Sequence, residues 1–186
     1  MNIGFAMCGS FCTFSQVFPV MELLTHDHTV TPIFSQAVYS IDSRFGPAKE
    51  HFETALKITG KAPLHTILQV EPIGPKELFD LLVIAPCTGN TLAKLSCGIA
   101  DGPVTMAAKS HLRNGRPVLL AVSTNDALGA AAENIGRLLA RKHYYFVPFR
   151  QDSPDGKPTS MVADFSLIPK AVECALAGKQ VQPILL

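Results

Sequence analysis

A run of small polar residues follows an apolar stretch between Asp80 and Thr105, where the sequence reads DLLVIAPCTGNTLAKLSCGIADGPVT. Leu81 to Ala85 predicts a buried strand, and Pro86, which has no N–H for a β-ladder, is expected to end it. A helix is predicted to begin near Thr91. Hydroxyls, an amide and free backbone N–H groups at such a helix start can hold an anion or the polar edge of a ring. The residues that supply them are Thr88, Gly89, Asn90 and Thr91.

Two other turns carry similar chemistry. Gly9 and Ser10 follow the apolar run Ile3–Met7, and a Ser-Thr-Asn sequence follows the run Val118–Val122. Glycine lets a backbone approach a phosphate closely, and a hydroxyl near a helix N-terminus can donate to it. Ordinary helix capping explains each turn taken alone. The coincidence of three such turns favours a nucleotide-like ligand, with Ser123, Thr124 and Asn125 among its binding residues.

The type of nucleotide is narrowed by motifs that the sequence lacks. It has no GxGxxG after the first predicted strand, and no acidic residue ends the second one to bind the ribose of a dinucleotide. GxxxxGK[ST], the phosphate loop of many ATP-binding proteins, is also missing. A mononucleotide such as FMN therefore fits better than a dinucleotide or ATP.

Composition excludes several classes of partner. The 186 residues include 16 basic and 15 acidic ones without a block of like charge, so no binding of nucleic acid or of an anionic membrane is expected. The five cysteines form no CxxC pair and have no histidines at zinc-ligand spacing, which predicts reduced thiols. Residues 1–21 carry no charge, but polar insertions and Pro19 argue against a membrane segment. We expect a cytoplasmic protein.

Hydrophobic periodicity predicts strands alternating with helices. Such alternation implies right-handed parallel crossovers and a doubly wound parallel sheet of the Rossmann or flavodoxin-like kind, formed as a single domain over residues 1–186. Ligands then bind at the carboxyl ends of the strands. The predicted strands are Ile3–Met7, Val30–Phe34, Leu64–Leu68, Leu81–Ala85, Val118–Val122 and Tyr144–Val147. Helices are predicted near 14–24, 48–59, 91–97, 104–113 and 166–177, with a long one ending near 142 and a loop over 148–160.

The segment Ala85–Ala108 resembles the APATANTIAKIANGIADNLL-type segment of flavin-dependent cysteine decarboxylase-like flavoproteins. The resemblance extends to Gly9 and Ser10, to Ser35 after the second predicted strand, and to His65 in PLHTIL. It implies bound FMN and assembly into trimers or multiples of trimers. The FMN-binding residues that it and the three turns indicate are Gly9, Ser10, Ser35, Thr88, Gly89, Asn90, Thr91, Ser123, Thr124 and Asn125.

One family motif is largely missing. Decarboxylases of this group carry PxMNxxMW after the fifth predicted strand, whereas this chain has VSTNDALG over residues 122–129 and no tryptophan at all. Only Asn125 is retained. Decarboxylation of a cysteine peptide is therefore disfavoured, and Ser123 and Thr124 add donors suited to a dicarboxylate.

Other segments, such as KSHLRNGRPVLLAVSTNDALG and YYFVPFRQDSPDGKPTS, extend a finer resemblance over the whole chain. It implies one subunit of a two-component system in spore-forming bacteria. Such a system oxidises a dihydrodipicolinate-type intermediate of the lysine pathway to pyridine-2,6-dicarboxylate, and the partner subunit resembles a nicotinamide-dependent dehydrogenase. Two alternatives remain open, a non-catalytic subunit that stabilises the partner or delivers substrate, and a flavin-dependent decarboxylase.

Few charged or imidazole side chains are candidates for chemistry. His65 could exchange a proton near a flavin because an imidazole titrates near neutral pH, although a lone histidine at a strand start is commonly structural. Arg150 and Lys157 are the predicted dicarboxylate ligands, with a solvated loop as the alternative. His51 is expected on a solvated helix face, and His111 at a helix end where a cation is favoured.

Overall fold

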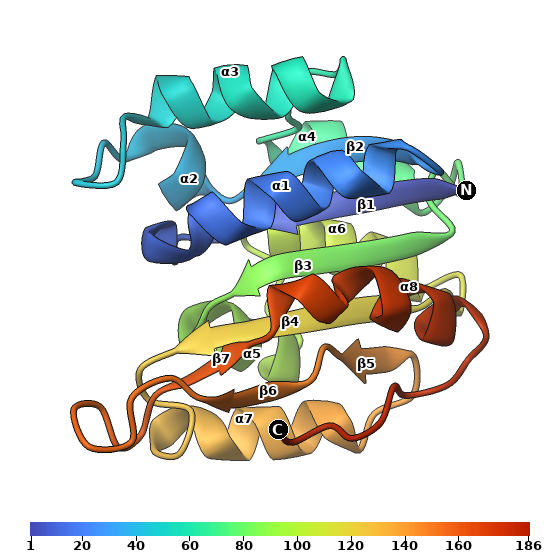
Figure 1. Cartoon of the computed structure of the whole chain (residues 1–186). Helices are drawn as coiled ribbons and strands as arrows, with labels where there is room; N and C mark the ends of the chain where they lie inside the picture. Colours follow the sequence, from blue (N-terminus) through green and yellow to red (C-terminus); the bar gives the residue numbers. More distant parts are fainter.

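The computed structural model describes residues 1–186 and has a seven-stranded sheet at its centre. Five strands are parallel, in the order β2-β1-β3-β4-β5, while β7 and β6 form an antiparallel extension on β4 (Figure 1). The doubly wound α/β fold is thus confirmed, with a mixed rather than purely parallel sheet. The strands are β1 (Asn2–Met7), β2 (Thr29–Phe34), β3 (Leu81–Cys87), β4 (Val118–Thr124), β5 (Tyr144–Phe146), β6 (Phe149–Gln151) and β7 (Met161–Ala163).

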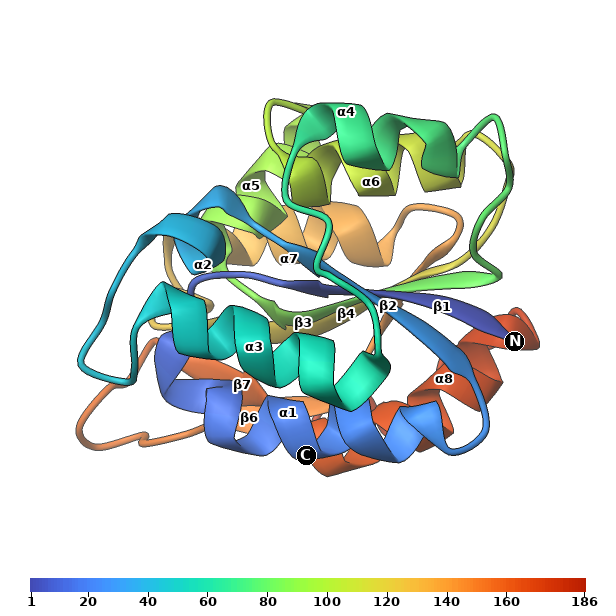
Figure 2. The same cartoon turned by 90° about the horizontal axis from the view of Figure 1, so that it is seen from above.

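Helices cover both faces of the sheet. Figure 2 shows α4, α5, α6 and α7 on one face and α1 and α8 on the other, while α3 packs against α1, α2 and β2 at the sheet edge. Their bounds are α1 (Phe14–Thr25), α2 (Gln36–Ser40), α3 (Ala48–Thr59), α4 (Ile67–Val70), α5 (Gly89–Cys97), α6 (Pro103–Leu112), α7 (Ala130–Leu139) and α8 (Ile168–Leu176). No helix is long and apolar enough to cross a membrane.

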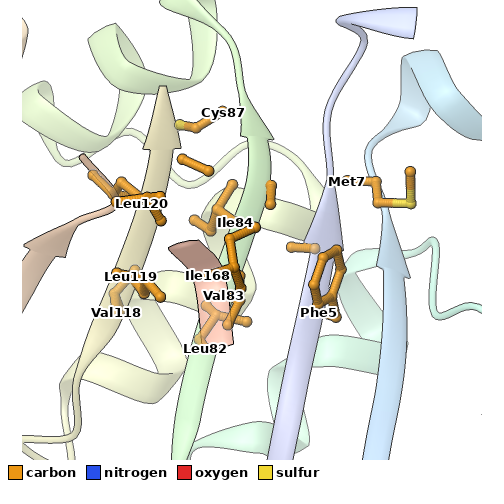
Figure 3. Packing of buried hydrophobic residues seen from close by; sticks show 14 of the residues in the cluster. Phe5, Met7, Leu82, Val83, Ile84, Cys87, Val118, Leu119, Leu120 and Ile168 are labelled. Carbon is orange, nitrogen blue, oxygen red and sulfur yellow. The ribbon is translucent and has the colours of Figure 1, made fainter. Parts of the chain in front are cut away.

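The core lies along the two central strands, β3 and β4. Every residue of β3 is buried, as are the first six of β4, because helices cover these strands on both faces. Figure 3 shows Leu82 and Ile84 of β3 beside Leu119 and Leu120 of β4, with Ile168 of α8 packed against them. This continuous apolar packing fixes the strand ends from which the polar turns emerge.

The strand order reverses at β1, whose neighbours are β2 on one side and β3 on the other. In a doubly wound sheet the chain leaves the carboxyl ends of two such strands in opposite directions, which opens a crevice between them. Gly9 and Ser10 follow β1, and the Thr88–Thr91 turn follows β3. The fold therefore places both turns at the switch point.

Two predicted strand boundaries are wrong. Leu64–Leu68 is not a strand: Leu64 alone bridges Ile33, and Thr66 then caps α4, because the Thr66 side chain accepts from the Gln69 N–H while the Gln69 side chain accepts in return. Pro86 does not end β3, which continues to Cys87. The pairing register with β4 shifts between Ile84 and Cys87, so the missing proline N–H falls at an irregularity of the ladder.

The late loop and one helix also differ from prediction. Phe149–Gln151 forms β6 within the segment predicted as a loop over 148–160, and only residues 152–160 lack a strand or helix. β6 is three residues long and pairs with a strand ten residues later, a signal too short for periodicity to reveal. α7 ends at Leu139, before the predicted end near 142.

Candidate functional site

Two adjoining hollows lie at the carboxyl edge of the sheet, with volumes of about 490 and 440 Å³. Gly9, Thr88 and Asn90 line both, so the two hollows form one cleft over the switch point. The first hollow is also lined by Ser10, Phe11, Cys12, Thr13, Phe45, Gly89, Ser123, Thr124, Asn125, Asp126, Asp152, Lys157, Ser160, Met161 and Val162. The second is also lined by Cys8, Ser35, Gln36, Ala37, Thr91, Lys94, Asp101, Gly102, Pro103, Val104 and Thr105.

A hydroxyl pair joins the first and fourth strand ends across this cleft. The Oγ atoms of Ser10 and Ser123 lie 2.8 Å apart, although 113 positions separate them in sequence. Ser123 is buried, and Ser10 is partly exposed at the mouth of the first hollow. One hydroxyl donates to the other, which leaves a second donor hydrogen to point at a ligand.

The turn after β3 is fixed by its own hydroxyls. The Thr88 Oγ1 atom accepts from the Thr91 N–H and caps α5. Thr91 in turn donates its hydroxyl to Cys8 Sγ at 3.2 Å, which ties this turn to the end of β1. Burial raises the pKa of the Cys8 thiol to about 11 and the pKa of Cys87 well above its ordinary value. Both are neutral thiols at neutral pH and pack as small apolar groups.

Asn125 anchors the loop of residues 152–160 beside the first hollow. Its backbone carbonyl accepts from the Thr159 hydroxyl at 2.6 Å, and its side-chain Oδ1 accepts from Ser160 at 3.3 Å. Only the Nδ2 group is left to face a ligand. The retained residue of the family motif thus has a structural function as well as an exposed donor.

Each hollow contains one lysine, and each lysine pairs with an aspartate. Lys157 Nζ lies 3.4 Å from Asp152 in the first hollow, and Lys94 Nζ lies 2.9 Å from both oxygens of Asp101 in the second. The Ser160 hydroxyl and Lys157 lower the pKa of Asp152, and hydrogen bonding by Lys94 lowers the pKa of Asp101. The hollows are consequently polar without a strong net charge.

Gly89 sits against a pair of side chains from the turn after β4. A methyl group on Gly89 would lie 2.7 Å from Thr124 Oγ1 and 2.8 Å from Asp126 Oδ1, and these two side chains hydrogen-bond to each other. Neither distance is compatible with van der Waals contact. Glycine is therefore required where the family segment quoted above has alanine, and the freed space is filled by the Thr124–Asp126 pair.

The ten predicted cofactor residues all line this cleft, as does Lys157. Ser35 joins it by capping α2, where its Oγ accepts from the Val38 N–H. Arg150 lies outside both hollows and pairs with Asp164 at 3.2 Å. His65 also lies outside them. Its ring stacks on Tyr39 with 3.8 Å between centroids, and its Nδ1 is 3.1 Å from the Pro63 carbonyl.

Two other histidine predictions are wrong. His51 is not solvated but only 6% exposed, because its side chain turns inward among Phe11, Phe14 and Phe18. Burial lowers its pKa. His111 is 1% exposed, and burial lowers its pKa to about 4, so it is neutral rather than a cation at a helix end. Its Nε2–H donates to the Pro117 carbonyl at 3.0 Å.

Sequence reasoning missed several residues of the cleft. Phe45 and Asp152 arrive from loops whose position depends on tertiary packing, and no local pattern marks them. Asp126 had a signal, since it is the fourth residue of the polar turn after β4. Phe11 also had one, because it directly follows the Gly9-Ser10 turn.

Known proteins support this picture. A family model described as Flavoprotein matches residues 1–161. The B subunit of dipicolinate synthase from Bacillus subtilis (strain 168) is 45% identical over 185 residues, which cover 99% of this chain and 92% of that protein. The chain therefore belongs to the flavoprotein family.

Solved structures agree with this assignment. The crystal structure of the B subunit of dipicolinate synthase from Bacillus halodurans C matches with a TM-score of 0.91 at 44% identity, covering 100% of this chain and 95% of that one. The FMN-dependent cysteine decarboxylase SpaF matches with a TM-score of 0.71 at 22% identity, covering 95% of each chain. The second match shows a shared fold alone.

Proposed function

We propose that this chain is the flavoprotein component of a dipicolinate synthase. It would act with the A component of that enzyme, a nicotinamide-dependent protein that we call the dehydrogenase subunit, to oxidise a dihydrodipicolinate-type intermediate to pyridine-2,6-dicarboxylate during sporulation. The observation that carries the proposal is the similarity to a dipicolinate synthase component over 99% of the chain, combined with a polar cleft at the switch point of the sheet. As in the family resemblance, we propose a cytoplasmic homo-oligomer, a trimer or a multiple of trimers.

The residues of the cleft fit FMN. A phosphate monoester and the polar edges of an isoalloxazine ring need hydroxyl, amide and backbone N–H donors, which are the groups that line both hollows. Gly9 leaves the backbone open on the cleft side, since a methyl group there would already contact Ala37 Cβ at 3.4 Å. The Ser10–Ser123 pair and the Thr88–Thr91 turn would hold the cofactor, with Ser35, Asn90, Thr124 and Asn125 around them.

The oxidation removes a hydride and a proton from the dihydropyridine, and aromatisation of the ring favours the product. Bound FMN would supply a two-electron acceptor. Lys157 would orient a substrate carboxylate in the first hollow, because its partner Asp152 is exposed and the ion pair can exchange for a ligand. Arg150 would need to leave Asp164 to assist.

The proton would pass to His65 or to water. His65 lines neither hollow, so a direct role in catalysis requires that another copy of the chain brings it to the cleft. This requirement ties the proposed role of His65 to the proposed homo-oligomer. Water reaches the cleft without any such assembly, since Ser10 and Asn90 are not fully buried.

Two alternatives have less support. A non-catalytic component that stabilises the dehydrogenase subunit or delivers substrate would not need the hydroxyls that line the cleft. A flavin-dependent decarboxylase is disfavoured because the turn after β4 holds the Thr124–Asp126 pair instead of the family motif.

The first experiment measures flavin binding. The wild-type protein should show visible flavin absorption when purified gently, or acquire it when FMN is added. Ser10→Leu should abolish binding, because the larger side chain enters the first hollow and breaks the contact with Ser123. Ser15→Leu is the matched control, since Ser15 is exposed on α1 outside both hollows. Equal FMN affinity of the two variants would contradict the assigned site.

The second experiment measures function. The dehydrogenase subunit, its nicotinamide cofactor and the dihydrodipicolinate-type intermediate are mixed with and without this chain, and dipicolinate is followed by ultraviolet absorption. We expect product formation to depend on this chain and to fall with Ser10→Leu. A full rate without the chain, across a range of ratios of the two proteins, would refute a catalytic role.

A further inference from the structure

A second set of hollows lies along α6, outside the cleft described above. The third hollow, of about 380 Å³, shares Thr105 with the cleft, and the fourth, of about 670 Å³, shares Lys109 with the third. Thr105, Lys109 and Leu112 follow each other at i, i+4 and i+7, so they form one stripe on the helix. The cleft therefore continues as a groove along α6, which we call the α6 groove.

The α6 groove is strongly basic in a chain that is almost neutral. Its lining contains five of the 16 lysines and arginines but only one of the 15 acidic residues, Glu71. No run of like charge predicts this patch, because its cations come from three separate segments that the fold brings together. They are Lys76, Lys109, Arg113, Arg141 and Lys142, with His143 beside them.

These charges are available to a partner. None of the five lysines and arginines forms an ion pair within the chain. Arg141 is held in place, since its guanidinium donates to the carbonyls of Leu95 at 3.1 Å and Ser96 at 2.6 Å. His143 has a φ of 69°, a left-handed conformation that is rare for a residue other than glycine. A fixed arginine beside a strained histidine gives one end of the groove a defined shape.

The groove also has apolar surface between its charges. Leu95, Ile99, Leu112 and Tyr144 line the third hollow, and Met106, Pro72 and Pro75 line the fourth. Figure 2 shows α4, α5 and α6 side by side on this face of the sheet. The ten residues of α6 span about 15 Å, which an extended peptide of about five residues would match.

We propose that the α6 groove binds an extended acidic segment of the dehydrogenase subunit that carries apolar side chains between its carboxylates. The inference rests on the proposed function in that it takes the dehydrogenase subunit as the partner. Charge complementarity selects an acidic segment, and the apolar lining selects a protein over nucleic acid or a lipid headgroup, which would leave that lining uncovered. Because the groove opens into the cleft at Thr105, a segment bound there would hold the dehydrogenase subunit beside the cofactor site.

The test compares two double variants of equal net charge. Lys109→Glu with Lys142→Glu reverses two exposed cations of the groove. Lys57→Glu with Lys170→Glu reverses two exposed cations on α3 and α8, away from it. Binding of the purified dehydrogenase subunit is measured by calorimetry at low and high salt. We expect the groove variant to lose at least about tenfold in affinity and most of the salt dependence, while the control changes by less than about threefold.

Further measurements separate the possible results. FMN titration of the same variants should be unchanged, so a failure of flavin binding would count against the proposed function and not against the groove. A photo-crosslinker at Lys142 should capture an acidic segment of the dehydrogenase subunit. Equal affinities of the two variants, no binding of the dehydrogenase subunit by the wild type, or crosslinks only to another copy of this chain would overturn the inference. Tighter binding of duplex DNA or anionic vesicles than of the dehydrogenase subunit would overturn it as well.

Discussion

Substitution of Gly89 by alanine tests how the cleft is packed. The new methyl group would lie 2.7 Å from Thr124 Oγ1 and 2.8 Å from Asp126 Oδ1, so the hydrogen-bonded pair must move. Overpacking costs about 1–3 kcal/mol, and the lower end applies because both side chains are at least partly exposed. Alanine gains up to about 1 kcal/mol in a helix interior but less at Gly89, the first residue of α5.

We therefore expect Gly89→Ala to lower the free energy of unfolding by about 1 kcal/mol, a fall in Tm of about 2–4 °C for a chain of this size. In a Thr124→Ala background the same change should cost almost nothing, because the hydroxyl is gone and Asp126 is free to rotate. Urea unfolding of the four proteins measures this coupling. Gly136→Ala is the control, since nothing lies within 4 Å of its methyl position and it should stabilise α7. An equal cost of Gly89→Ala in both backgrounds would refute the reasoning.

Three further predictions concern titratable groups. The pKa of His111 is about 4 in the folded chain and 6.5 in the unfolded one, so its contribution to stability is complete above pH 6.5 and is lost as pH falls toward 4. Urea unfolding should show a loss of up to about 3 kcal/mol over that range, and His111→Gln, which keeps a donor for Pro117, should reduce the slope; an unchanged slope would contradict this account. Iodoacetamide at pH 8 should label the exposed Cys12 and Cys97, whereas the neutral buried thiols of Cys8 and Cys87 should react only in urea, as mass spectrometry can show. If His65 accepts the proton, His65→Gln should remove the acidic limb of the pH profile of kcat while Tyr39→Leu keeps it; the same loss from both variants would indicate a structural role through their stacking.

The parts of the fold that depend on local patterns are predictable from the sequence. β3 and β4 are recognisable because a strand buried on both faces is apolar at nearly every position. α4 is hidden because its capping box, Thr66 with Gln69, lies inside an apolar run that is also typical of a strand. β6 and β7 escape prediction because strands of three residues depend on pairing with distant segments rather than on their own composition.

The site follows the same division. The turns after β1, β3 and β4 are predictable, because helix caps that follow parallel strands must meet at one edge of the sheet. Their meeting is seen most directly in the 2.8 Å contact between Ser10 and Ser123. Phe45 and the basic patch around Lys109 are not predictable, since tertiary packing alone assembles them. The polar neighbours of His51 hide the fact that its own side chain faces Phe14 and Phe18.

β4 changes its neighbour halfway along its length. Residues 118–120 pair with β5, whereas Ser123 and Thr124 pair with β7. The hairpin of β6 and β7 is thus attached to the ligand-facing tip of β4 and takes no part in the parallel ladder. Exchange of this hairpin between relatives offers evolution and protein engineers a way to alter what the cleft accepts while the five-stranded folding core keeps its pairing.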